Sequence, residues 1–297
     1  WYGSINRSCF HEAAGKWGAD AFLAAFIFVT NNKGKTMIAP NPKKTGLVLS
    51  GGGVRGMAHI GVLKALQEYG VDSHWVSGTS VGALVGALYA QGIVVDDMLT
   101  FFKETPLFRY NFFSFNKPGL LDTDRYIKIF ESFWPENSFE SLNRPLYVVA
   151  TDLMEGREVV FHEGELIRPL LASAALPPIF SPVKIGDRMY ADGGIMNNFP
   201  LEPLTKKVDF VIGSNVSVVK TVSQRELRSS FQLTSRTTAL MIYAINREKI
   251  NRCNLVFEAV ELEKIGVLDK KGIEKAFLIG YDHASRKLEA TLNQTSS

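Results

Sequence analysis

The stretch GLVLSGGGVRGMAHIGVLKAL, residues Gly46–Leu66, contains three local patterns in a row. GLVLS, residues 46–50, is a short apolar run with a glycine boundary, which predicts a buried strand. From Met57 onward the apolar residues stand near helical spacing, and Gly70 is predicted as the C-cap. The glycine-rich turn Gly51–Gly56 stands between the two. A strand, a glycine turn and a helix in this order predict the first unit of an α/β fold.

The same order of strand and helix recurs along the chain. HWVSG, residues 74–78, predicts a second strand, and SVGALVGALYAQG, residues 80–92, predicts a helix whose small residues allow close packing on a sheet. Further strands are predicted within residues 145–153, 157–164, 187–194, 208–216 and 253–260, and helical stretches at about 224–250 and 271–294. Residues 96–144 are predicted to be irregular and are rich in aromatic side chains. This alternation predicts an α/β fold with a mostly parallel central sheet and helices on both faces.

The composition narrows the classes of protein to consider. The 297 residues are 46% hydrophobic, which suffices for one large α/β domain, or two small ones, with a sizeable core. The 33 basic and 30 acidic residues give a net charge of +3 without a basic run, so no nucleic-acid partner is expected. The cysteines Cys9 and Cys253 are predicted to be reduced thiols, and neither has a histidine at metal-ligand spacing, so no metal site is expected. No apolar run reaches the roughly 18 residues of a membrane-spanning helix.

The N-terminal segment differs from the rest of the chain. Its apolar run AFLAAFIFV, Ala21–Val29, follows Lys16 and could pass for the apolar region of a short signal peptide, but TNNKGK follows it where a small-residue cleavage site would stand. Met37 opens MIAPNPKKTGLVLS, which looks like a natural start. We therefore predict that residues 1–36 are an extension or a leader, and that residues 37–297 form the domain. A cytoplasmic or peripheral-membrane location is expected, and secretion stays open.

The turn Gly51–Gly56 fits the G-x-G-x-x-G pattern of dinucleotide sites, but its context disagrees with that reading. Its backbone N–H groups and the following helix N-terminus would attract any negative charge. A dinucleotide site also needs an acidic residue at the end of the second strand, about 20 positions on. Asp72 has roughly that separation but precedes the strand. A nucleotide cofactor is therefore not expected.

The second strand ends instead at Gly78-Thr79-Ser80-Val81-Gly82, a G-x-S-x-G between a predicted strand and a predicted helix. This context favours a nucleophile elbow, in which the serine stands on a sharp turn above the sheet. The competing interpretation is an ordinary turn in which Ser80 caps the helix.

A nucleophilic serine needs a base. None of the five histidines stands in a convincing late loop after a strand: His59 lies one turn into the first helix and is expected to be a packed or capping residue, and His283 lies in the last helical stretch. Asp192, in RMYADGG, ends a predicted strand and is followed by two glycines, so its carboxylate could reach Ser80 directly.

The stretch LFRYNFFSFNKPGLL, Leu107–Leu121, is rich in aromatic residues. It could form an acyl channel, a lid or a membrane-touching lip, or it could be a packed insertion.

Three segments together resemble the patatin-like phospholipases of bacteria: SGGGVRGMAHIGVLKAL (50–66), SGTSVGALVGAL (77–88) and YADGGIMNNFP (190–200). Their order and spacing match that family: a glycine-rich loop, then G-x-S-x-G, then D-G-G far downstream. PLYVVATDLMEGREVVF (145–161) and ASAALPPIFSPV (172–183) also resemble its connecting segments. The resemblance is strong over about residues 44–203 and weak over the last third.

The resemblance implies a three-layer architecture related to the α/β-hydrolases and a hydrolase of acyl lipids without a metal or cofactor. It implies that Ser80 is the nucleophile and Asp192 the base, and that the Gly51-Gly52-Gly53 loop supplies N–H donors to an oxyanion. The supporting positions of the same motifs are Arg55, Gly56, Gly78, Gly82, Gly193 and Gly194. Arg55 could hold the loop, attract a lipid phosphate, or simply be solvated. Ser50 stands where the family often has Asp, and D-G-G where plant members have D-G-A; neither difference affects the dyad.

The expected activity is therefore hydrolysis of fatty-acyl esters, as in phospholipases A and lysophospholipases. The expected partner is an acyl lipid, with contact to a membrane or lipid aggregate possible and the oligomeric state open. Two other readings remain: an esterase or transacylase acting on a non-phospholipid ester, and a catalytically silent lipid-binding scaffold. The presence of both Ser80 and Asp192 argues against the silent scaffold.

Overall fold

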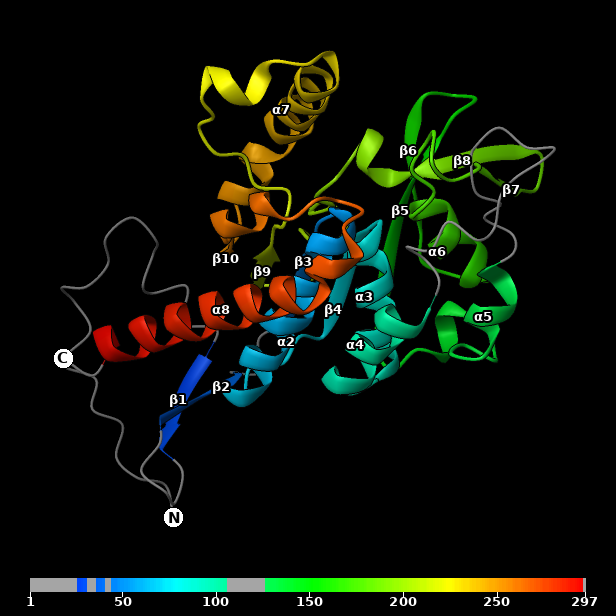
Figure 1. Cartoon of the computed structure of the whole chain (residues 1–297). Helices are drawn as coiled ribbons and strands as arrows, with labels where there is room; N and C mark the ends of the chain where they lie inside the picture. Colours follow the sequence, from blue (N-terminus) through cyan, green and yellow to red (C-terminus); the bar gives the residue numbers. More distant parts are fainter. Residues whose placement is uncertain (1–25, 31–35, 41–43, 106–125, 296–297) are drawn as a thin grey trace.

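The computed structural model describes residues 26–30, 36–40, 44–105 and 126–295, and an eight-stranded sheet forms its centre (Figure 1). The strand order is β10-β9-β3-β4-β5-β8-β7, with β6 paired to β5. These strands are β3 (Thr45–Leu49), β4 (Trp75–Thr79), β5 (Leu146–Asp152), β6 (Arg157–Phe161), β7 (Val183–Ile185), β8 (Arg188–Asp192), β9 (Phe210–Ser214) and β10 (Leu255–Phe257).

Helices connect most of these strands. The α-helices are α2 (Met57–Glu68), α3 (Val81–Gln91), α4 (Val95–Glu104), α5 (Ile127–Glu131), α6 (Ile167–Ser173), α7 (Ser230–Asn251) and α8 (Ile273–Thr295). Short 3₁₀ turns that matter below are η1 (Gly53–Gly56), η5 (Gly193–Ile195), η6 (Gln224–Leu227) and η7 (Val260–Lys264).

The sheet is parallel on one side and antiparallel on the other. Strands β10, β9, β3, β4 and β5 run parallel, as the alternation of strands and helices predicts. Strands β6 and β8 pair antiparallel with β5, and β7 pairs antiparallel with β8. The prediction of a mostly parallel sheet with helices is therefore confirmed, with an antiparallel part formed by β6, β8 and β7.

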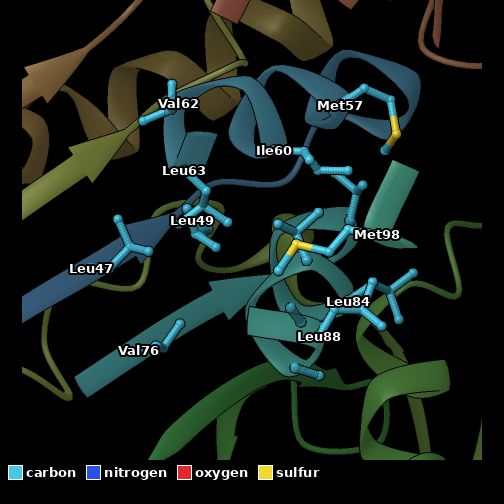
Figure 2. Close-up of a cluster of buried hydrophobic side chains, with 14 of the residues drawn as sticks. Leu47, Leu49, Met57, Ile60, Val62, Leu63, Val76, Leu84, Leu88 and Met98 are labelled. Carbon is cyan, nitrogen blue, oxygen red and sulfur yellow. The ribbon is translucent and has the colours of Figure 1, made fainter. Parts of the chain in front are cut away.

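The alternation of side chains along β3 divides the core between the two faces of the sheet. Leu47 and Leu49 belong to one buried cluster, and Val48 belongs to another. Figure 2 shows the first cluster, in which the two leucines lie near side chains of α2, α3 and α4 such as Met57, Ile60, Leu84, Leu88 and Met98.

The opposite face is covered by a smaller cluster. Phe199, Leu201 and Leu204, which follow the D-G-G motif, pack there together with Ile250 at the end of α7. The buried thiol of Cys253 belongs to the same cluster and is free. Both faces of the sheet are therefore covered, and the second face is covered by a connecting segment and the end of α7.

The prediction of an irregular segment at residues 96–144 is wrong in part, because α4 and α5 lie within it. In α4, the buried residues Val95, Met98, Phe101 and Phe102 stand at helical spacing, and the helix has acidic residues in its first turn. The aromatic stretch 107–121 lies outside the described residues, so its role stays a prediction.

The described part of the N-terminal segment contains one antiparallel pair, β1 (Phe26–Thr30) with β2 (Thr36–Pro40). Met37 falls within β2, and the domain boundary placed there stays a prediction. Across the described ranges, no helix combines the length and the apolar character that crossing a bilayer requires.

Candidate active site

Ser80 stands on the turn between β4 and α3. Its φ of 56° and ψ of −128° make it one of two described non-glycine residues with positive φ. Its carbonyl accepts hydrogen bonds from Ala83 N (2.9 Å) and Leu84 N (3.2 Å), which begin α3. Backbone strain of this kind holds a nucleophile clear of its own helix. The side chain is half-buried and therefore reachable.

The pairing of β5 brings Asp192 to Ser80. Val149 of β5 pairs with Thr79 of β4, and the adjacent Ala150 pairs with Asp192 of β8. β6 also pairs with both Val149 and Ala150, so β6 occupies one edge of β5 along both residues. β4 and β8 must therefore lie one after the other along the opposite edge of β5. Two strands running in opposite directions therefore end against each other on that edge, and their last residues meet.

At this meeting point the Ser80 hydroxyl donates a hydrogen bond to Asp192 Oδ2 over 2.6 Å. The other carboxylate oxygen, Oδ1, accepts from Gly194 N at 2.7 Å. The Asp192 backbone is also fixed, because its carbonyl accepts from Thr151 Oγ1 (2.9 Å) and its N–H donates to Ala175 O (3.0 Å). Asp192 is thus held on both sides and points one oxygen at the serine.

The environment of Asp192 alters its basicity. Burial raises the pKa of Asp192 to about 6, and the hydrogen bonds from Ser80 and Gly194 offset only part of that rise. A carboxylate with its ordinary pKa near 3.8 is a weak base at neutral pH. The raised pKa makes Asp192 a better proton acceptor while leaving it mostly ionised at pH 7.

The glycine loop after β3 lies beside Ser80. A Cβ placed on Gly51 would stand 3.2 Å from Ser80 Cβ. The Gly51 N–H donates to Asn198 O (3.1 Å), and Val54 N donates to Val267 O (2.8 Å). Between these two bonds, the N–H groups of Gly52 and Gly53 have no acceptor among the described residues.

The hydrogen bond of the Gly51 N–H bears on one expectation about the loop, which stays a prediction. Three glycines were expected to donate to an oxyanion, but the Gly51 N–H is already used in holding the loop against Asn198. The N–H groups of Gly52 and Gly53 are the ones without an acceptor among the described residues. Gly53 also has a φ of 58°, a left-handed conformation that glycine adopts without strain.

Arg55 links the end of the glycine loop to residues 263–265. Its Nε donates to Ile265 O (2.7 Å) and its Nη2 donates to Glu263 O (3.3 Å). The guanidinium is half-buried, and burial lowers the pKa of Arg55 while nearby Glu263 raises it. Of the roles considered, these contacts favour holding the loop, and they contradict a freely solvated side chain.

The supporting glycines lie where elements approach closely. A Cβ on Gly78 would stand 2.5 Å from Gly82 O, and one on Gly82 would stand 2.3 Å from Leu49 O. A Cβ on Gly193 would stand 2.2 Å from Val149 O. Gly56 would meet Val81 in the same way, and Gly194 would meet Asn198. Side chains at these positions would push β3, β4, β5 and the two loops apart.

Two residues of this site had no predicted role. Ser173 of α6 accepts from Ser80 N (2.8 Å) and donates to Val149 O (2.6 Å), so it links the elbow to β5. Asn198 joins the loop that follows Asp192 to the glycine loop, since its carbonyl accepts from Gly51 N and its Nδ2 donates to Gly51 O (3.4 Å). Both lie in quoted motifs, ASAALPPIFSPV and YADGGIMNNFP, but only their contacts reveal what they do.

The histidines considered as bases lie elsewhere. His59 is fully buried, with Nδ1 bonded to Ser214 Oγ (2.8 Å) and Nε2 to Ser50 O (2.9 Å). Burial lowers the pKa of His59 to about 4, which keeps the ring neutral. His59 therefore packs beneath the glycine loop, as expected, and His283 lies on α8. Among the described residues, Asp192 is the carboxylate or imidazole that the Ser80 hydroxyl contacts.

The sequence matches one protein family and is similar to several known proteins. The patatin-like phospholipase family matches residues 47–205, a range that includes the glycine loop, Ser80 and Asp192. An uncharacterised NTE family protein of Mycobacterium bovis is 34% identical over 164 residues, which cover 54% of this chain and 45% of that protein. Lysophospholipase NTE1 of Cryptococcus neoformans is 29% identical over 207 residues, which cover 63% of this chain and 12% of that protein. The chain therefore spans less than half the length of these relatives.

Among solved structures, VipD from Legionella pneumophila resembles the chain with a TM-score of 0.52 at 15% sequence identity. The likeness covers 90% of this chain and 70% of VipD. At this identity the comparison shows a shared fold and nothing about activity.

Proposed function

Because this chain belongs to the patatin-like phospholipase family, we propose that it hydrolyses fatty-acyl ester bonds of lipids with Ser80 as nucleophile and Asp192 as base. The observation that carries the proposal is the 2.6 Å hydrogen bond from Ser80 Oγ to Asp192 Oδ2 on a strained elbow. The similarity to a protein named lysophospholipase supports a phospholipid or lysophospholipid substrate.

The first half of the reaction forms an acyl-enzyme. Ser80 Oγ attacks the ester carbonyl carbon while its proton passes to Asp192 Oδ2. The carbonyl oxygen becomes negatively charged in the tetrahedral intermediate, and the N–H groups of Gly52 and Gly53 are the donors available to it. Donors aimed at such an oxygen stabilise the transition state more than the ground state. Collapse of the intermediate breaks the ester C–O bond, and Asp192 returns the proton to the departing alcohol.

The second half frees the enzyme. Water attacks the acyl-enzyme carbonyl and gives a proton to Asp192, and the same N–H donors stabilise the second oxyanion. Collapse then breaks the bond to Ser80 Oγ, which recovers its proton from Asp192, and the fatty acid leaves. A carboxylate with a pKa of about 6 suits both directions of this transfer, since it takes a proton readily at neutral pH and releases it again.

The substrate class is tested by fatty-acid release from a lysophospholipid, a diacyl phospholipid and a set of soluble esters of increasing chain length. The proposal expects kcat/KM to rise with acyl chain length and to be highest on a lipid. Asp192→Asn and Ser80→Ala proteins serve as blanks. A preference for short soluble esters, with no release from either lipid, would contradict lipid hydrolysis and favour an esterase on the same dyad.

A further inference from the structure

Helix α7 exposes an apolar face to solvent. Leu233, Leu240, Met241 and Ile245 are 51%, 42%, 68% and 52% exposed. These positions are seven, eight and twelve residues after the first, so they fall on one side of the helix. Isolated exposed apolar residues are ordinary, but four on one helix face form a continuous stripe.

The exposed face of α7 also lacks charge. From Ser230 to Ile245 the one charged residue is Arg236, and it turns inward, where Nη2 donates to Lys220 O (2.7 Å) and Nη1 pairs with Glu263 (3.3 Å). The remaining exposed residues of this stretch are uncharged: Ser230, Gln232, Thr234, Thr237, Thr238 and Ala244. A solvent-facing helix normally carries charged residues there, so this face is suited to an apolar surface.

The opposite side of α7 ties the helix to the loop that carries the base. Asn246 Oδ1 accepts from Phe199 N (3.2 Å), and Lys249 pairs with Glu202 (2.7 Å). Ile250 is buried in the cluster on that face of the sheet. Figure 1 shows α7 extending past the carboxyl ends of β3 and β4, on the side of the molecule where α2 begins. Ser80 follows β4 directly, so α7 projects at the end of the sheet that carries Ser80.

Further exposed apolar side chains lie close to the dyad in the chain or in contact with its loops. Ile195 and Met196, three and four residues after Asp192, are 42% and 40% exposed. Val267, whose carbonyl accepts from Val54 N at the end of the glycine loop, is 37% exposed. Exposed apolar side chains therefore stand on the loop that follows Asp192 and on the segment that contacts the glycine loop.

We propose that the α7 face, defined as Leu233, Leu240, Met241 and Ile245, is the surface with which the protein docks on a lipid aggregate that carries anionic head groups. The inference rests on the proposed function and names how the site reaches its substrate. A helix lying in a lipid interface buries its apolar side among the acyl chains and keeps basic residues at the head groups.

Charge around α7 selects a lipid surface over a second copy of the chain. Arg225 and Arg228 precede the helix and Arg247 and Arg252 follow its face, all four exposed, with Glu226 and Glu248 as the acids of the same stretch. Two copies paired through this face would bring basic ends together, whether the helices ran parallel or antiparallel. Anionic head groups would instead satisfy both ends at once.

The experiment measures vesicle flotation of Ser80→Ala protein, so that binding is read without hydrolysis. Vesicles of phosphatidylcholine, with or without phosphatidylglycerol, are the probe. Met241→Glu should lower the partition coefficient on the mixed vesicles about tenfold, and the uncharged Leu240→Gln should lower it by a smaller factor. Leu278→Glu is the matched control, since Leu278 is 54% exposed on α8, and it should bind like its parent. All variants should unfold at the parent's temperature.

Charge is tested by Arg228→Gln with Arg247→Gln, which should weaken binding to the mixed vesicles and reduce its sensitivity to salt. The Met241→Glu change in active protein should slow hydrolysis of vesicle lipid and leave hydrolysis of a soluble short-chain ester unchanged. Equal binding by the Met241→Glu protein and its parent, or an equal loss in the Leu278→Glu protein, would overturn the docking surface. So would a dimer, seen by light scattering, that Met241→Glu separates without changing vesicle binding.

The two proposals fail separately. If Met241→Glu weakens vesicle binding but the unaltered protein hydrolyses no ester, the proposed docking surface stands and the proposed lipid hydrolase is rejected. If Met241→Glu leaves the hydrolysis of both soluble and vesicle esters unchanged, the proposed lipid hydrolase stands and the proposed docking surface is rejected.

Discussion

At the residue scale, the proposed chemistry depends on the positions of Ser80, directly after β4, and Asp192, the last residue of β8. Both were predictable, because G-x-S-x-G after a strand and D-G-G after another are local patterns. Ser173 and Asn198 were not, because each acts on a partner far away in sequence: Ser173 on Ser80 and Asn198 on Gly51. No local pattern in a single sequence encodes such contacts.

The raised pKa of Asp192 predicts the pH dependence of the reaction. The base must be ionised, so kcat/KM should rise through pH 6 and level off near pH 7 to 8. At pH 5 it should be about one tenth of the plateau, since one group with a pKa of about 6 is then about one tenth ionised. A rate profile on a soluble ester measures this. A rising limb centred near pH 4 would mean that burial does not raise this pKa.

The close approach of Gly52 and Val216 leads to a prediction about two coupled substitutions, Gly52→Ala and Val216→Ala. A Cβ on Gly52 would stand 2.6 Å from Val216 Cγ2, so Gly52→Ala should lower the free energy of unfolding by about 1–3 kcal/mol and displace its N–H. The resulting loss of kcat should be at most the roughly 10²–10³-fold seen when an oxyanion donor is removed. Val216→Ala makes room, so the double variant should regain part of both losses. Denaturant unfolding and kcat of all four proteins test this, and strictly additive effects would count against it.

At the element scale, the helices and the parallel strands were predictable from their apolar periods, while pairing direction was not. β5 and β6 were expected as strands, but their sequences do not indicate that β6 and β8 pair antiparallel with β5. That pairing is what brings β8 against the end of β4. α4 was missed although its buried residues have helical spacing, because the surrounding aromatic residues hid the period. The break between η6 and α7 follows from a capping box at Ser229 and Gln232.

The hydrogen bonds between Arg55 of η1 and the end of η7 lead to a prediction for Arg55→Lys. A lysine loses the fork that reaches both Ile265 O and Glu263 O. The free energy of unfolding should fall by about 1–2 kcal/mol, and kcat should fall more than KM rises, because the loop with the oxyanion donors loses its support. The matched control is Arg286→Lys, on an exposed residue of α8, which should change neither. A rise in KM with kcat intact would indicate instead that Arg55 binds the lipid.

At the scale of the whole molecule, one sheet brings the three motifs together from segments far apart in the chain. The glycine loop, the elbow and the D-G-G turn follow β3, β4 and β8, and β3 is also bonded to β9. The overall class was predictable from the alternation of strands and helices. The covering of the second face by Phe199, Leu204 and the end of α7 was not, since that cluster joins residues with no shared period.

The domain boundary gives a prediction at this scale. A protein that begins at Met37 lacks β1 and so leaves β2 without its partner strand. Because residues 1–36 carry none of the three motifs, this protein should keep its melting temperature and its kcat on a soluble ester. It should also pellet less with membranes, since the run Ala21–Val29 is gone. A melting temperature several degrees lower would show that the segment packs on the domain.

The most direct test of the Ser80–Asp192 dyad is the rate at which a fluorophosphonate labels the protein, followed by mass spectrometry of the labelled peptide. The dyad predicts one adduct, on Ser80, in the unaltered protein and none in the Ser80→Ala protein. It further predicts that Asp192→Asn, which keeps the serine and removes the base 2.6 Å away, slows labelling by about 10³-fold or more with an unchanged melting temperature. Labelling of the Asp192→Asn protein at the unaltered rate, or an adduct on another residue, would contradict the account.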